Sequence, residues 1–374
     1  MSLEQINTMI RLRVLPFAVL SLTVYGCSPF FNSMYFKISY KPSKIKPIDQ
    51  VNFPEEYHIS NVPCISYKTA YCATASYQMA CYQKGLHNDI DFYNWVMGFT
   101  YGAMFNKKNN SFIPYNDPET GFVAARNYTA IKRHYLTTND SVLFINSVKY
   151  YISRGEPLRV GLNPAILRHK KGFSPHSELI IGYTKDSLFY YETGVYNRYI
   201  SNYRGEACSW ADFVKSVSSF CITMGYPWKY NISVFEKIKP DTLGLLKCSK
   251  RNGELLIGRK NGPYFRTGSC ALKEYGDYIK KCNNELNWAN ISQWIEQARV
   301  IRRDNAGFIK RKFSNNADAI IVAEMLLASG EKYAEIWGLI NTKNYNKETI
   351  GNYLIQCGKL ENQAGQLLLK ISKE

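Results

Sequence analysis

The stretch YCATASYQMACYQKG at residues 71–85 sets the architecture expected for the first half of the chain. From Tyr71 to Lys84 it contains small residues and good helix formers, and Gly85 is typical of the position just past a helix C-terminus. We therefore expect a helix here, with Cys72 in its first turn. Unpaired N–H groups and the positive end of the helix dipole stabilise a thiolate at that position, which lowers the thiol pKa from its usual value of about 8.5.

Other cysteines near this helix have less distinctive positions. Cys81 comes nine residues after Cys72, which places it half a turn around the helix at about 100° per residue, so we expect it to be a packing residue. Cys64 precedes the helix, and the pattern leaves its role open. No pair among the ten cysteines has CxxC spacing. A zinc ribbon or thioredoxin-like site is therefore disfavoured, and we expect neither a metal nor a cofactor.

A second informative stretch is PHSELIIGYTKDSLFYYETG at residues 175–194. Two strand-like runs, 178–183 and 187–192, flank a turn-like triplet, which predicts a β-hairpin. His176 opens the first strand and Glu192 ends the second. Because these two ends lie side by side in an antiparallel pair, the carboxylate can hold the imidazole in one tautomer. Residues 157–162 indicate a further strand.

A cysteine at a helix start, a histidine and then an acidic residue form the side-chain set of thiol acyl transfer. The histidine shares the thiol proton, the acidic residue orients the histidine, and the sulfur attacks a carbonyl. This chemistry assigns Cys72 as nucleophile, His176 as base and Glu192 as orienter. Four further residues near these elements are candidates for binding substrate: Ser66, Tyr67, Asn163 and His169.

This arrangement resembles the papain-like cysteine peptidase superfamily, especially its bacteriocin-processing branch, where an Asp takes the third position. More specifically, residues 58–374 resemble the butirosin biosynthesis protein H group, through Tyr71-Cys72, MGFTYGAMF at 97–105 and GEPLRV at 155–160. The resemblance implies an α+β, papain-like fold, in which the helix bearing the cysteine packs on an antiparallel sheet. It also implies an acyltransferase that moves an acyl group from a thioester through the cysteine to an amine.

Two departures from the peptidase pattern influence the expected reaction. Glu192 replaces the usual Asp, which adds one methylene to the orienter. The Gln that supplies an oxyanion donor before the cysteine is missing, and Ser66, Tyr67 and Lys68 occupy that place. Acyl transfer or amide formation is therefore favoured over hydrolysis. The alternatives are a cysteine peptidase or amidase acting on envelope peptides, and a non-catalytic papain-like binding lipoprotein.

The first 27 residues have the layout of a secretory signal. Arg11 and Arg13 precede a short apolar segment at 14–24, and Gly26 comes directly before Cys27. This pattern resembles the bacterial lipoprotein signal, in which the cysteine is lipidated. We expect a lipid-anchored protein of the bacterial cell envelope, with a cytoplasmic location as the alternative. Residues 28–57 contain a Pro- and Lys-rich segment and should form an extended tether.

Composition limits the remaining function classes. The 374 residues carry a net charge of +17, and 45% are hydrophobic, which excludes wholesale disorder. No apolar run reaches the roughly 18 residues of a spanning helix, so a polytopic membrane protein is excluded. The positive surplus favours an acidic partner or an anionic membrane surface besides the acyl-thioester or peptide substrate. The chain has no nucleic-acid-binding motif, and we expect no nucleic-acid partner.

The length is typical of two domains. We expect a papain-like catalytic domain at 58–228 and a helical accessory domain at 229–374. Apolar residues recur at helical spacing within 288–301 and again within 321–340, as core-facing stripes do.

Overall fold

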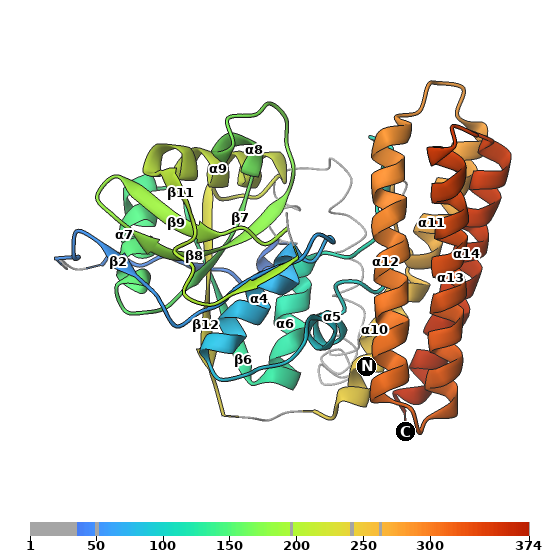
Figure 1. Ribbon diagram of the computed structural model, residues 1–374, viewed down its shortest axis with the longest axis horizontal. Coiled ribbons are helices and arrows are strands. Elements are labelled where there is room, and N and C mark those ends of the chain that lie inside the picture. Colours follow the sequence, from blue (N-terminus) through green and yellow to red (C-terminus); the bar gives the residue numbers. More distant parts are fainter. Residues whose placement is uncertain (1–35, 49–51, 195–196, 240–242, 262–263, 374) are drawn as a thin grey trace, which may run out of the picture.

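The computed structural model describes residues 36–48, 52–194, 197–239, 243–261 and 264–373. The chain is a mixture of helices and mainly antiparallel strands, and a lobe of long helices stands beside a lobe built on a sheet (Figure 1). The predicted export signal and its Cys27 lie outside the described residues. Within these ranges, no helix has both the length and the apolar character that a bilayer-spanning segment needs.

The first lobe is organised by a sheet with strand order β1-β6-β12-β7-β8-β9-β11, and β2 pairs with β8 beside this path. Its pairs are antiparallel except for β1 with β6. The strands are β1 (Ser43–Lys44), β2 (Tyr57–His58), β6 (Ile131–Thr138), β7 (Leu158–Leu162), β8 (His176–Tyr183), β9 (Ser187–Tyr191), β11 (Glu206–Ser209) and β12 (Tyr230–Lys237). Almost every residue of β7 and β8 is buried, as the short apolar runs of their sequence indicate.

The hairpin predicted at 178–192 is confirmed as β8 and β9, and the strand expected at 157–162 is confirmed as β7. A bulge interrupts the β8–β9 register between Ile180 and Gly182. At Gly182 a Cβ atom would lie only 2.9 Å from the backbone of Tyr57 in β2. Glycine at this position therefore lets β2 approach the hairpin closely.

Helices cover the sheet. The predicted cysteine helix is α4 (Cys72–Gln83), which packs against β8, and Gly85 follows it with a positive φ of 84°. The others are α5 (Ile90–Met97), α6 (Pro118–Thr129), α7 (Ser141–Ile152), α8 (Pro164–Leu167) and α9 (Trp210–Thr223). Asp and Ser side chains cap several of these helices, as Asp140 does by accepting from two N–H groups at the start of α7.

The expectation of an extended, solvated tether is wrong for residues 36–48. Phe36 and Tyr40 are buried and pack edge-on against aromatic rings of the sheet lobe, including Tyr226. The segment between the two prolines then adds β1 to the edge of the sheet beside β6. Two large aromatic side chains bury enough apolar surface to hold this segment in place, and that outweighs the tendency of Pro and Lys toward open chain.

The change to helical structure comes later than predicted. Residues 230–237 form β12, which lies inside the main sheet between β6 and β7, so the expected boundary at 228/229 is wrong. The local signal for this strand is the alternation of Tyr230, Ile232 and Val234 with the polar Asn231 and Ser233, a two-residue period typical of strands. After it come η1 (Leu245–Lys247), α10 (Cys248–Ile257), α11 (Gly268–Lys281), α12 (Trp288–Lys312), α13 (Ala317–Asn341) and α14 (Lys347–Ile371). The two predicted apolar stripes lie in α12 and α13.

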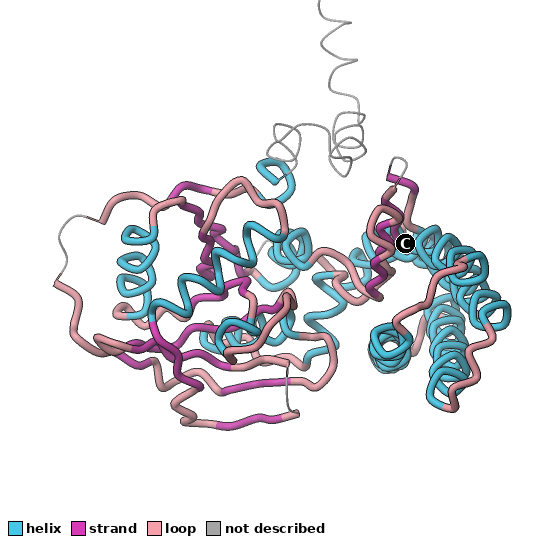
Figure 2. The backbone as a smooth tube through the Cα atoms, turned by 90° about the horizontal axis from the view of Figure 1, so that it is seen from above, coloured by secondary structure: helices cyan, strands magenta, loops and turns pink. Residues whose placement is uncertain are grey.

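The long helices bundle together, as the view from above shows (Figure 2). A small sheet of order β13-β14-β4-β5 ties this bundle to the first half of the chain. Its strands are β4 (Met104–Asn106), β5 (Ser111–Ile113), β13 (Lys260–Asn261) and β14 (Phe265–Thr267). Phe105 and Phe112 of the β4–β5 hairpin belong to the apolar core of the helical lobe. The segment 97–105 therefore connects the two lobes.

Candidate active site

Cys72 is the first residue of α4, and its side chain is half-buried. No acidic residue stands in the first turn, and Tyr71 at the cap position makes no side-chain hydrogen bond to the helix end. The N–H groups of this turn therefore face no competing carboxylate on their own helix. Their partial positive charge stabilises an anion on the Cys72 sulfur.

His176 comes to the same place from the start of β8, where it pairs with Leu162 of β7. Its imidazole is close enough to Cys72 that each group shifts the pKa of the other. The Nε2 atom lies 2.8 Å from Oε1 of Glu192. The imidazole thus interacts with both the Cys72 sulfur and a carboxylate.

Glu192 follows the last residue of β9, beside His176 across the hairpin. Its Oε1 also accepts the N–H of Gly194 at 3.1 Å, and its Oε2 pairs with Arg168. Burial raises the pKa of this carboxyl, but the hydrogen bond and charge of His176, with the Arg168 charge, lower it to about 2. Glu192 is therefore ionised throughout the neutral range. The structure brings together the three side chains that the sequence singled out.

The charges of the pair favour thiolate and imidazolium. Burial raises the pKa of Cys72, but the charge and hydrogen bond of His176, followed by the charge of Arg159, lower it below its ordinary value. Burial lowers the pKa of His176, but the charges of Glu178 and Cys72 raise it well above its ordinary value. Each partner thus stabilises the charged form of the other.

Cys72 is electrostatically unlike the cysteines around it. Burial raises the thiol pKa of six others: to about 11 for Cys64, to about 12 for Cys208, Cys221 and Cys248, and above the ordinary value for Cys81 and Cys357. Cys81 is fully buried, as expected of a packing residue. Cys64 belongs to β3 (Cys64–Ser66), which pairs with β10 (Arg198–Ile200). The thiolate is therefore more accessible at Cys72 than at these six positions.

A buried polar network lies behind the pair. Ser177 of β8 hydrogen-bonds Ser76 of α4 at 2.9 Å, and its hydroxyl accepts from Nε of Arg159 at 2.7 Å. Arg159 and Arg133 both pair with the buried Glu119 of α6. These bonds lock α4 against β7 and β8, so the sulfur and the imidazole are held by elements that cannot shift independently.

Sequence reasoning missed Glu178. Its side chain is fully buried, and Oε1 lies 3.2 Å from Nε2 of His176. Alternate residues of a strand point to the same face, so a position two residues after His176 was the signal that could have identified it. The nitrogen of His176 and one oxygen from each of Glu178 and Glu192 lie within 4.8 Å of one another.

The four predicted substrate-binding residues have mainly structural positions. Asn163 caps α8 and bonds the loop that leads to His176, since its Oδ1 accepts the N–H of Ser174 at 3.3 Å. His169 is exposed on that loop, and its neighbour Arg168 reaches the site instead. Ser66 is buried in β3. Tyr67 is closest to the site, because its N–H donates to the carbonyl of Thr193.

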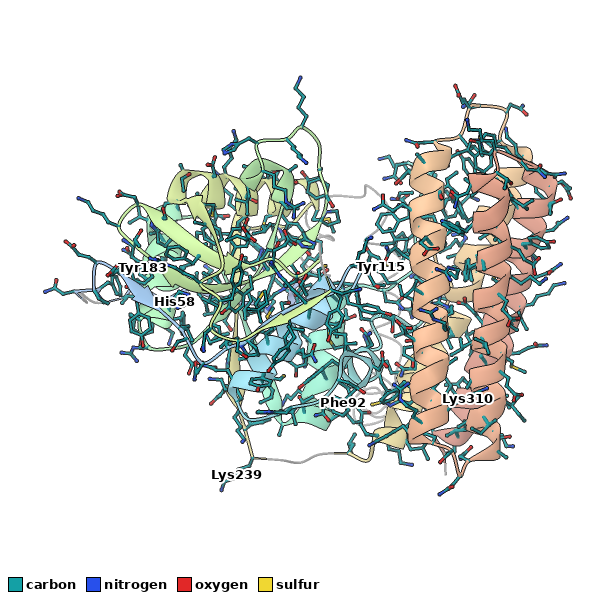
Figure 3. The ribbon with its side chains drawn as sticks, in the orientation of Figure 1. His58, Phe92, Tyr115, Tyr183, Lys239 and Lys310 are labelled. Atoms are coloured by element: carbon teal, nitrogen blue, oxygen red, sulfur yellow. The ribbon has the colours of Figure 1, made fainter. Side chains whose placement is uncertain are left out.

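The helical lobe contributes residues that the sequence did not indicate. Oε1 of Gln297 in α12 accepts the N–H of Ala70 at 2.7 Å, two residues before Cys72. The Tyr71 hydroxyl donates to Asp304 of the same helix at 2.9 Å. Tyr115 lies between the lobes (Figure 3) and touches Trp294 edge-on. Burial raises the pKa of its hydroxyl, the nearby Cys72 adds to this effect, and His176 opposes it. Helix α12 therefore holds the loop that precedes the candidate nucleophile.

Comparison with known protein families finds no match to the chain, and comparison with curated proteins finds no similar protein.

Proposed function

We propose that this chain is a papain-like thiol enzyme of the butirosin biosynthesis protein H type, which transfers acyl groups through Cys72. His176 is its general base and acid, and Glu192 orients the imidazole. The observation that carries the proposal is the placement of Cys72. It begins a helix, interacts with an imidazole held by a buried carboxylate, and has a lowered pKa where six other cysteines have raised ones.

The first half of the proposed reaction loads the enzyme. The Cys72 thiolate attacks the carbonyl of a thioester, and the pair of electrons from the C=O bond moves to oxygen. When the tetrahedral species collapses, the bond to the leaving thiolate breaks and the His176 imidazolium supplies the proton that the leaving sulfur takes. The product is an S-acyl Cys72 and a neutral imidazole.

The second half transfers the acyl group. An amine attacks the S-acyl carbonyl while the neutral imidazole accepts the amine proton. Collapse breaks the bond to Cys72 sulfur, releases an amide and restores the thiolate–imidazolium pair. Glu192 stays ionised throughout, because its pKa is held near 2. Its charge stabilises each imidazolium that forms.

Transfer is favoured over hydrolysis because the loop before Cys72 lacks the Gln of the peptidases. The backbone N–H of Ala70 is bound by Gln297 of the helical lobe. Peptide amides are poor acyl donors that depend on strong oxyanion stabilisation, whereas thioesters are already activated. Cysteine peptidase or amidase activity on peptides is the alternative that the experiment must separate.

Alkylation of the full chain with iodoacetamide tests the nucleophile. We expect Cys72 to be labelled selectively at pH 6–7, because the thiolate is the reactive form. Peptide mass spectrometry identifies the labelled cysteine, and Cys81→Ala is the matched control within the same helix. Labelling of Cys72 only above pH 8–9 would overturn the enzyme proposal and favour a binding module.

Product analysis separates transfer from hydrolysis. An acyl thioester of a small thiol is incubated with and without a primary amine, beside a peptide amide. We expect an acyl adduct on Cys72 that the amine converts to amide, and no adduct with Cys72→Ser. Release of cleaved peptide with no amide from the thioester would favour the peptidase.

The lipid anchor is a separate proposal that depends on Cys27. Expression in bacteria with labelled palmitate should label the wild-type chain and leave Cys27→Ser unlabelled, since a lipidated cysteine is the attachment point. An unlabelled wild-type chain would favour the cytoplasmic alternative.

A further inference from the structure

Glu178 takes no part in the acyl-transfer steps above, although it lies against the imidazole that performs them. Its Oε1 is 3.2 Å from Nε2 of His176, and its Oε2 accepts the N–H of Thr193 at 3.1 Å. The side chain is fully buried, and among the described residues Oε1 has no hydrogen-bond partner. A buried carboxylate oxygen without a hydrogen bond is costly for a fold to keep unless it serves another group.

The carboxyl groups of Glu178 and Glu192 both lie close to the same nitrogen, Nε2 of His176. Nε2 carries a single hydrogen, and the 2.8 Å contact with Glu192 Oε1 uses it. The longer contact with Glu178 is therefore not a second hydrogen bond from this nitrogen. Two carboxylates this close to one atom do not both ionise easily, because like charges repel strongly in a buried site.

The surroundings decide which of the two holds the negative charge. Glu192 has Arg168 and the N–H of Gly194 besides the imidazole, and its carboxyl pKa is lowered to about 2. Burial raises the carboxyl pKa of Glu178 to about 8, with the Glu192 charge adding to the effect and the His176 charge opposing it. Neighbouring carboxyl groups with oppositely shifted pKa values have different roles.

We propose that Glu178 is a second positioning residue for His176, because its buried carboxyl group lies 3.2 Å from Nε2 on the side of the ring that Glu192 also contacts. The inference rests on the proposed role of His176 in acyl transfer. At neutral pH Glu178 fills the space beside the ring without adding charge. When the pH rises, ionised Glu178 faces the imidazolium at 3.2 Å and opposes its deprotonation.

The other groups around Glu178 do not provide an equivalent partner. In the described part of the chain, His176 is the cation in ion-pair contact with it. Arg159 pairs with Glu119, and Arg168 pairs with Glu192. Among the described residues, the other titratable groups that interact with Glu178 are Cys72 of α4, Cys64 of β3, Tyr190 of β9 and Cys208 of β11. These groups are neutral or anionic, so ionisation of Glu178 is balanced by the imidazolium.

The test follows the ring nitrogens of His176 by NMR in the full chain as a function of pH. In Glu178→Gln, which keeps the shape, we expect the titration midpoint of the imidazolium to fall by about one pH unit or more. Iodoacetamide labelling of Cys72 at pH 6–7 should change by less than about twofold, because Glu178 adds no charge there. Glu178→Asp retains a carboxyl group, so the titration midpoint of His176 should stay close to the wild-type value.

Glu236→Gln is the matched control, since Glu236 contacts the surface imidazole of His134 at 2.6 Å. It should leave the His176 midpoint unchanged. An unchanged midpoint in Glu178→Gln would overturn the inference, as would an equal loss of Cys72 labelling at pH 6 and pH 9. If wild-type Cys72 resists labelling at neutral pH while the midpoint still moves, the acyl-transfer proposal fails and the role of Glu178 toward the imidazole stands.

Discussion

Two buried groups of charged side chains, one in each lobe, differ in how completely their polar atoms are bonded. In the helical lobe, Arg302 of α12 donates to both oxygens of Glu361 and to the carbonyls of Thr100 and Gly102, all between 2.7 and 2.9 Å. Glu361 also accepts from Ser329. In the sheet lobe, the His176 group keeps an unbonded carboxylate oxygen and a half-buried sulfur.

The two buried groups therefore have different roles, one in stability and one in reactivity. A fully bonded buried pair has no capacity left for a substrate, and Arg302–Glu361 joins the lobes because two of its acceptors lie in the segment after α5. A partly bonded group with oppositely shifted pKa values can gain and lose protons. We therefore expect substitutions in the first group to change stability, and those in the second to change reactivity.

The largest effect is expected from Arg302→Met. Removing one partner leaves the Glu361 charge buried without compensation, which should lower the free energy of unfolding by about 3–5 kcal/mol. Denaturant titration measures this loss, and Arg303→Met beside it, which is exposed, is the control. At temperatures where the variant is folded, Cys72 labelling should remain close to wild type. A stable variant with unreactive Cys72 would contradict the separation of the two groups.

His176→Ala should have the next largest effect, on reactivity. Without the imidazolium, burial should raise the pKa of the Cys72 thiol and reduce the fraction present as thiolate. The rate of Cys72 labelling at pH 7 should therefore fall about 100-fold. His134→Ala, on the surface, should leave the rate unchanged. If His176→Ala labels Cys72 as fast as wild type, the helix N-terminus alone stabilises the thiolate.

Glu192→Gln should lower the Cys72 labelling rate at pH 7 about 10-fold, because the imidazolium loses its charged hydrogen-bond partner. The same change has a pH signature in stability. The depressed pKa of Glu192, about 2, makes its contribution complete above pH 4.5 and lost as the pH falls through 2. The stability difference between wild type and variant should therefore shrink between pH 4.5 and 2, as acid denaturation series would show. A constant difference would contradict the pairing of Glu192 with His176.

Gln297→Ala should give the smallest effect. Loss of the hydrogen bond to the Ala70 N–H should destabilise the ordered conformation of the loop before Cys72 by about 0.5–1.5 kcal/mol. We expect a labelling rate reduced only a few-fold, within the limits of that energy. Gln293→Ala, exposed on the same helix, is the matched control. If both variants behave like wild type, the helical lobe does not help to position the nucleophile.

Local sequence patterns predicted those parts of the site whose structure depends on residues close together in the chain. The helix at Cys72 follows from its helix-forming residues and the glycine stop, and the hairpin follows from two short apolar runs around a turn. An antiparallel pair brings its two free ends together, so the proximity of His176 and Glu192 was also predictable.

Other features depend on contacts between distant residues. The burial of Phe36 and Tyr40, the insertion of β12 into the sheet, and the hold of Gln297 on the Cys72 loop join segments that are far apart in sequence. Residues nearby in the sequence do not reveal these contacts. The alternation of Tyr230, Ile232 and Val234 indicates a strand but not its place between β6 and β7, because that place depends on the strands it pairs with.

The sequence by itself therefore determined which side chains are chemically able to act, since helix starts and strand ends follow from nearby residues. Only the tertiary structure decided their charges. The protonation of Cys72, His176 and Glu178 depends on burial and on the distances between atoms of α4, β8 and the segment after β9, and these arise only when the chain has packed.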